Sequence, residues 1–208
     1  ILRCASVKRF HDGELIAARG APARQWVGCA KGAVRVCSTS LSGKQITLTN
    51  VEPGIWFGDI AMFDGDQRTH DAYAHGATTV LSVTRGNLER LLKQHVELYE
   101  AFLQLQARRI RLLFGQIEDL ATLPLRSRLA KQICQLMRGY GAPNPPGERE
   151  VLITLKLAQE ELAQLLGASR QRVNQELKAM ERAGAIRIDP AGLVVRDLPL
   201  LQQISRGE

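Results

Sequence analysis

Two helical patterns of apolar residues meet at a short break of small residues in the last quarter of the chain. Before Gly167-Ala168 the apolar positions recur at i, i+3 and i+4, at Leu162, Leu165 and Leu166. After it they recur at i, i+4 and i+7, at Val173, Leu177 and Met180. Ser169 suits the N-cap of the second helix, and Gly184 suits the positive φ just past its end. Residues 159–186 are therefore predicted to form a helix-turn-helix.

The outward face of the second helix is rich in groups that hydrogen-bond to bases. With the apolar stripe turned to the core, six polar residues remain at the helix start and on the solvent side: Ser169, Arg170, Gln171, Asn174, Gln175 and Lys178. Arg donates two bonds to guanine O6 and N7, and Asn or Gln pairs with adenine N6 and N7. These six are the predicted DNA-binding residues. The alternative is an ordinary helical hairpin with a solvated polar face.

In the N-terminal half, short β-rich runs alternate with turn residues. The expected strands are residues 6–10, 14–20, 25–30, 33–38, 44–51 and 78–84. Turns are expected at Asp12-Gly13, Lys31-Gly32 and Ser42-Gly43. This spacing predicts a small all-β barrel or sandwich. Metalloenzymes with a jelly roll need clustered histidines, and the four histidines here form no HxH pair, so we expect no metal site and no catalytic residues.

The run FGDIAMFDGDQRTHDAYA, residues 57–74, has the groups needed to hold a phosphorylated ligand. Arg68 would pair with the phosphate, Thr69 would donate a hydroxyl bond, and backbone N–H groups near Gly58 would cradle oxygens. Asp59 would accept from a sugar hydroxyl. The alternative is a solvated turn in which Arg68 pairs with a neighbouring carboxylate, that of Asp64, Asp66 or Asp71.

A helical pattern runs from Asn87 to Leu120 without a proline. Two rows with a spacing of seven follow it, apolar except for Gln106: Leu103, Ile110 and Ile117, and Gln106, Leu113 and Leu120. Such a seam predicts a homodimer; the alternative is that the stripe packs on its own β domain. The arginines between the seam residues are expected to form a solvated flank: Arg108, Arg109 and Arg111.

The remaining segments complete the C-terminal part. Residues 121–123 are the candidate hinge, a further helix is expected from Pro124 to Met137, and residues 141–150 form a Gly/Pro-rich loop before a strand at 151–158. Residues 185–197 predict a hairpin with its turn at 189–192, that is, a wing. Its Arg187 and Arg196 are candidate phosphate contacts.

Composition agrees with a nucleic-acid partner. The 208 residues are 45% hydrophobic and 24% charged, with a net charge of +7, which favours a polyanionic partner. The four cysteines have no metal-ligand spacing and are expected to be reduced packing residues of a cytoplasmic protein. No apolar run approaches the ~20 residues that span a bilayer, so no membrane association is expected. The sequence opens at Ile1 without an initiator methionine, and we expect an upstream segment.

Three features occur together: a β-rich half with FGDIAMF and RTHDAYA, a long helix, and a winged helix-turn-helix that carries GASRQRVNQELKAMERAGAI. Together they resemble the cyclic-AMP receptor protein and fumarate-nitrate reduction regulator (Crp/Fnr) family of bacterial transcription factors, over essentially the whole chain. The resemblance implies an α+β protein with a jelly-roll, cyclic-nucleotide-binding-like sensor. It also implies a homodimer on a palindromic promoter site, with RNA polymerase as a candidate partner.

The chain departs from the family pattern at several positions. Gln171 and Gln175 stand where the receptor has Glu and Arg, so a different operator is expected. Asp59 stands where the family has Glu, while Leu113 and Phe114 replace hydroxyl side chains that face the adenine. These changes argue against cyclic AMP, and the expected effector is a cyclic nucleotide or another phosphorylated small molecule.

The expected organisation has three parts: a sensor at residues 1–86, a dimerisation helix and hinge at 87–121, and a DNA-binding domain at 122–208. The function so predicted is a sequence-specific transcriptional regulator without catalytic activity. The alternative from another class is a nucleotide sensor whose C-terminal helices bind protein partners.

Overall fold

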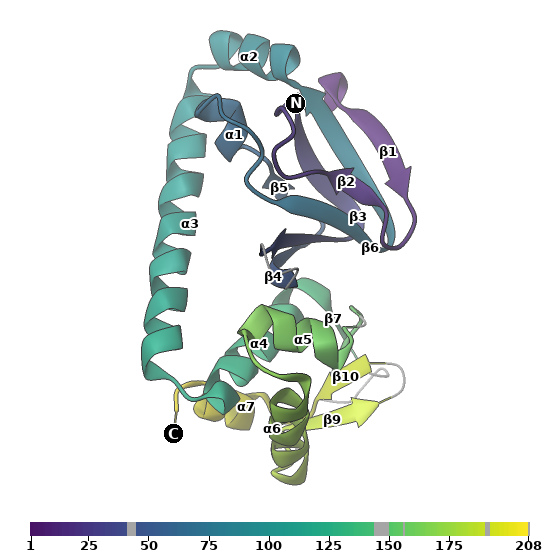
Figure 1. The fold of residues 1–208 in the computed structure, drawn as a ribbon, viewed down its shortest axis with the longest axis vertical. Helices are drawn as coiled ribbons and strands as arrows, with labels where there is room; N and C mark the ends of the chain where they lie inside the picture. Colours follow the sequence, from purple (N-terminus) through teal and green to yellow (C-terminus); the bar gives the residue numbers. More distant parts are fainter. Residues whose placement is uncertain (41–44, 144–149, 156, 190–191, 208) are drawn as a thin grey trace. The chain divides into compact units, whose positions relative to one another are not determined.

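The computed structural model describes residues 1–40, 45–143, 150–155, 157–189 and 192–207 (Figure 1). They divide into two compact units, Ile1–Leu112 and Leu113–Glu208, with the division inside one helix, α3 (Glu97–Thr122). The expected turn at Ser42-Gly43, most of the Gly/Pro-rich loop and the tip of the wing lie outside the described residues. No helix among those described is both long and apolar enough to cross a bilayer.

The first unit is built on one antiparallel sheet, after a short 3-10 helix, η1 (Leu2–Cys4). Its strands are β1 (Ser6–Phe10), β2 (Leu15–Ala17), β3 (Gln25–Thr39), β4 (Gln45–Val51), β5 (Trp56–Phe57) and β6 (Asp71–Thr84). The order is β1-β6-β3-β4, while β2 pairs with β6 and β5 pairs with β3. The predicted β-rich fold of the N-terminal half is confirmed.

Strand β3 corrects one predicted boundary. Two strands with a turn at Lys31-Gly32 were expected, but a single strand passes through this point. Its register against β6 shifts between Cys29 and Lys31 and again between Lys31 and Ala33, so the extra residues form bulges. Gly32 has φ +78°, and a Cβ there would lie 2.6 Å from the carbonyl oxygen of Ala77. The glycine thus bends a continuous strand.

The continuous helix expected from Asn87 to Leu120 is wrong, because α2 (Arg85–Gln94) ends before α3 begins. The Thr84 hydroxyl caps α2 by accepting from the backbone N–H of Asn87 at 3.3 Å. Three leucines of α2 lie in a hydrophobic core with Trp26 and Phe102: Leu88, Leu91 and Leu92. Helix α2 therefore packs within the first unit.

The described part of the second unit contains four helices after α3 and a small sheet. The helices are α4 (Leu125–Tyr140), α5 (Gln159–Leu166), α6 (Arg170–Arg182) and α7 (Leu198–Ser205). The strands β7 (Gly141–Pro143), β8 (Val151–Ile153), β9 (Ile186–Asp189) and β10 (Gly192–Val195) pair antiparallel in the order β7-β8-β10-β9. Helix α3 extends to Thr122, so two residues of the expected hinge are helical.

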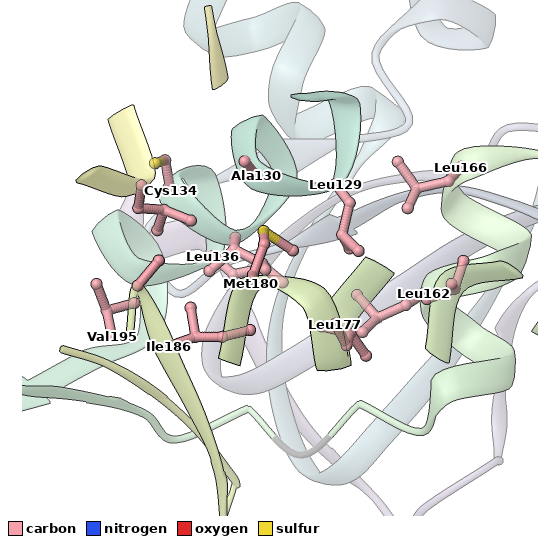
Figure 2. Packing of buried hydrophobic residues seen from close by; sticks show 14 of the residues in the cluster. Leu129, Ala130, Cys134, Leu136, Leu162, Leu166, Leu177, Met180, Ile186 and Val195 are labelled. Carbon is pink, nitrogen blue, oxygen red and sulfur yellow. The ribbon is translucent and has the colours of Figure 1, made fainter. Parts of the chain in front are cut away.

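The core of this unit joins α4, α5 and α6 to the wing strands. Figure 2 shows Leu129 and Leu136 of α4 beside Leu177 and Met180 of α6, with Leu162 of α5 nearby. Helix α7 was not predicted. Asp197 caps it by accepting from the backbone N–H of Leu200 at 2.9 Å, and Leu201 is fully buried. The helix therefore closes the same core.

Candidate DNA interface and ligand cassette

The two helices of the predicted helix-turn-helix form as expected. Gly167 ends α5 in the left-handed region with φ +61°, which only glycine adopts at little cost. Ser169 caps α6, and its hydroxyl accepts from the backbone N–H of Arg172 at 3.3 Å. Gly184 follows α6 with φ +84°. The local chemistry of these three positions sets the length and the start of α6.

The inward face of α6 is fully apolar. Val173, Leu177 and Met180 are buried in the core of the second unit, and they contact residues of α4 and α5 there. Small Ala163 of α5 is also buried in this core. Because three consecutive turns of α6 are anchored in this way, its opposite face is held in one orientation.

Five of the six predicted DNA-binding residues are exposed at the start or on the outward face of α6: Ser169, Arg170, Gln171, Gln175 and Lys178. Asn174 is half-buried, and its Oδ1 accepts from Nε2 of Gln159 at 3.2 Å. The sequence pattern did not single out Gln159, because a contact between the first turn of one helix and the middle of the next has no sequence signal.

Carboxylates hold several cations around this face. Glu176 of α6 accepts from Nε of Arg126 at 2.7 Å. In the wing, Glu150 accepts from both Arg187 and Arg196, at 3.0 and 2.8 Å. Arg187 also lies 3.5 Å from the carboxylate of Asp189. Both candidate phosphate contacts are therefore paired with carboxylates in the free protein, and a phosphate would compete with these.

In the first unit, Arg68 lies directly against Gly58. A Cβ on Gly58, whose φ is +81°, would stand 2.5 Å from Nη1 of Arg68. Nη2 of Arg68 donates to the carbonyl of Gln25 at 2.6 Å. None of the three carboxylates that were alternative partners pairs with it: those of Asp64, Asp66 and Asp71 bond backbone N–H groups instead. The internal pairing of Arg68 in that alternative is therefore wrong, while residues 63–67 of the turn are exposed as it expected.

The Arg68 guanidinium has no carboxylate partner in the described chain, and burial lowers its pKa below the ordinary value. A desolvated cation without a counter-charge favours an incoming anion. Thr69, the other predicted phosphate contact, is exposed beside it. The structure thus brings together Gly58, Arg68 and Thr69 on one segment of the unit.

Asp59 is placed differently from the expectation. Its side chain is only 1% exposed, and Oδ2 accepts from Nη1 of Arg109 at 2.5 Å and from the amide of Gln106. Nη2 of Arg109 donates to the carbonyl of Trp56, also at 2.5 Å. The expected solvated flank is therefore wrong for Arg109. Gln106 faces the segment at residues 57–74, which we call the ligand cassette. Oδ1 of Asp59 is buried without a hydrogen-bond partner among the described residues.

Comparisons with known proteins cover both units. Residues 7–95 match the cyclic nucleotide-binding domain, and residues 127–204 match the Crp-like helix-turn-helix domain. A CRP-like cAMP-activated global transcriptional regulator from Mycobacterium tuberculosis is 30% identical over 197 residues, covering 95% of this chain and 87% of the relative. The chain belongs to the Crp/Fnr family of transcriptional regulators. Crp/Fnr proteins are DNA-binding regulators rather than enzymes.

Other Crp/Fnr relatives differ in their named roles. A global nitrogen regulator from Synechocystis is 29% identical over 199 residues, covering 95% of this chain and 87% of the relative. Among solved structures, FixK2 from Bradyrhizobium japonicum has a TM-score of 0.85 at 20% identity, with 96% of each chain covered. TTHB099 from Thermus thermophilus has a TM-score of 0.74 at 26% identity, also with 96% of each chain covered. These likenesses leave the effector unspecified.

Proposed function

We propose that this Crp/Fnr protein is a cytoplasmic homodimer that reads a palindromic promoter site with the outward face of α6. The observation that carries the proposal is the pairing of a capped, core-anchored helix with five exposed polar residues on its other side. The first turns of a recognition helix reach the floor of the major groove. Arg170 and Gln171 lie in the first turn of α6. RNA polymerase is a further proposed partner.

Within this proposal the residues divide into two roles. Arg170 donates to guanine, and Gln171, Asn174 and Gln175 pair with adenine edges. Ser169 and Lys178 contact phosphates and fix the position of the helix without reading sequence. The division predicts that loss of a base contact changes preference at one base pair, whereas loss of a phosphate contact weakens all sequences alike.

The DNA-reading role is tested by selection from a random duplex pool, followed by gel shifts on the selected site and its single-base variants. Arg170→Ala is expected to lose about 5- to 150-fold of discrimination at one base pair in each half-site. Lys178→Ala is the matched control, expected to weaken all variants equally. If the native protein prefers no fragment over random DNA at moderate salt, the C-terminal helices serve protein partners instead.

Dimerisation is proposed through α3. Leu103, Ile110 and Ile117 are between 52% and 71% exposed, so the first apolar row is unpartnered within one copy. Gln106, the first residue of the second row, donates to Asp59 and is therefore not proposed as part of the dimer contact. A stripe of this length on one helix matches the two-stranded coiled-coil pattern. A second copy also supplies the second recognition helix that a palindrome needs.

For the sensor we propose a ligand with a phosphate group, bound by Arg68, Thr69 and the backbone near Gly58. The buried Oδ1 of Asp59 is the remaining acceptor for a ligand hydroxyl. Leu113 and Phe114 are apolar and exposed, unlike the hydroxyl side chains expected for adenine recognition. Although several relatives are named as cAMP-activated, these positions favour another phosphorylated effector.

Thermal-shift measurements with cyclic AMP, cyclic GMP and inorganic phosphate test the sensor. A ligand at 100 times its Kd stabilises the native state by about 2.7 kcal/mol, which is visible as a raised Tm. Arg68→Ala is expected to abolish the shift, and Arg24→Ala is the control because Arg24 is an exposed arginine of the same unit. A shift that persists in Arg68→Ala would contradict the assignment.

A further inference from the structure

Gln159 opens α5, and its side-chain amide reaches the outward side of α6. Nε2 of Gln159 donates to Oδ1 of Asn174 over 3.2 Å, and both side chains are half-buried. Neither side chain makes a second hydrogen bond within the described ranges. The contact joins residues that are 15 positions apart in the chain. It is a side-chain hydrogen bond between α5 and α6.

Both ends of this contact are held rigidly. The turn that carries Gln159 is capped by Glu161, whose carboxylate accepts from the backbone N–H of Ala158 at 2.8 Å. Asn174 follows fully buried Val173 on α6. A hydrogen bond between two anchored elements limits side-chain rotation more than one between flexible segments does, because the backbone that carries each partner does not move with the other.

An asparagine that reads adenine must present its amide edge in one orientation. Adenine offers N7 as an acceptor and N6 as a donor, so Nδ2 must donate while Oδ1 accepts. The terminal torsion of Asn is broad, and a free carboxamide exchanges the places of its two atoms at little cost. The hydrogen bond from Gln159 fixes the plane of the Asn174 carboxamide, and in the structure Oδ1 is the atom that faces the donor. This hydrogen bond leaves Nδ2 and the second lone pair of Oδ1 available to the base.

We propose that Gln159 is a positioning residue for base recognition, holding the carboxamide of Asn174 in the orientation in which it pairs with adenine. Gln159 itself touches no base. The inference rests on the proposed contact between α6 and base edges. It predicts that the preference at one base pair of each half-site depends on a residue outside the recognition helix.

The test compares Gln159→Met, Asn174→Ala and the double variant on the selected site and on its single-base variants. Asn174→Ala is expected to lose about 5- to 150-fold of discrimination at one base pair. Gln159→Met keeps the side-chain length but removes the donor, and is expected to lose roughly 3- to 10-fold at that same base pair. Its affinity for random DNA is expected to remain within about twofold, and the double variant to match Asn174→Ala.

Two controls separate positioning from other roles. Glu160→Gln changes the exposed neighbour and is expected to leave the base preference unchanged. Gln159→Lys restores an N–H donor on an unbranched stem and is expected to recover most of the discrimination, although its added charge raises affinity for all DNA. Equal loss in Gln159→Met and Gln159→Lys would overturn the donor role.

The failures are distinguishable. If Asn174→Ala changes no base preference, the proposed contact of Asn174 with bases fails and the positioning role fails with it. If Asn174→Ala changes preference but Gln159→Met weakens every sequence equally and reduces the salt dependence, Gln159 is a phosphate contact and only the positioning inference is wrong.

Discussion

At the scale of single residues, one buried carboxylate decides what the cassette offers a ligand. Asp59 lies where a sugar hydroxyl contact was expected, but its Oδ2 is taken by Arg109 and Gln106. These two residues are three apart on α3, so they share a helix face. An effector that engages Asp59 therefore either uses Oδ1 or displaces α3 side chains. Either way the occupied cassette and α3 are chemically linked.

Replacing Arg109 should expose the cost of that buried charge. Arg109→Ala leaves Asp59 unpaired, and the free energy of unfolding of the first unit is expected to fall by about 2 to 4 kcal/mol. Urea unfolding monitored by tryptophan fluorescence reports it, because Trp26 and Trp56 stack in the same unit at 4.2 Å. Arg108→Ala, an exposed neighbour, should change it by under about 0.5 kcal/mol. Adding Asp59→Asn to Arg109→Ala should recover part of the loss; no recovery would contradict a charge penalty.

Thiol reactivity gives a second prediction at this scale. Burial raises the pKa of Cys29 to about 11, and burial also raises the pKa of Cys37 and Cys134. At pH 8 roughly one Cys29 thiol in a thousand is the reactive thiolate, and the fraction grows as the pH approaches 11. Half-buried Cys4 is therefore expected to be the one thiol that reacts quickly with an aromatic disulfide reagent in the native protein. Denaturant should release the other three, whereas two or more fast native equivalents would contradict the burial.

At the scale of elements, the helix-turn-helix was predictable because its signals are local. The cap at Ser169, the break at Gly167 and the apolar spacing all act within a few residues. The continuity of β3 was not predictable, since Gly32 signals a turn and a bulge equally well, and pairing with β6 decides between them. The contacts of Arg109 and Gln159 were missed for the same reason: each joins elements far apart in sequence.

The exposed stripe on α3 leads to a prediction about assembly. Ile110→Glu combined with Ile117→Glu places two charges in the proposed seam, where burial without a partner is costly. The dimer dissociation constant is expected to rise on the order of 100-fold or more, which sedimentation equilibrium measures. Gln116→Glu adds one such charge beside the stripe and should leave the dimer intact. A monomeric native protein, or a dimer unaffected by the double variant, would contradict this seam.

At the scale of the whole molecule, a net charge of +7 and two copies of α6 combine in one prediction about DNA. Positive charge attracts any duplex, and its contribution weakens steeply as salt rises. Specific binding also requires both recognition helices to meet their half-sites at once, so the spacing of a palindrome is set by the dimer. The dependence of affinity on base sequence and its dependence on half-site spacing can therefore be measured separately on the same complex.

Inserting about 5 bp at the centre of the selected palindrome turns one half-site to the opposite side of the duplex. The affinity is expected to fall to that of a single half-site, because the second copy of α6 no longer reaches the groove, while affinity for random DNA stays unchanged. Quantitative gel shifts at two salt concentrations separate the specific loss from the general attraction. The same insertion outside the palindrome should have no effect. Unchanged affinity after the central insertion would mean that each copy binds its half-site independently, which a rigid seam along α3 does not allow.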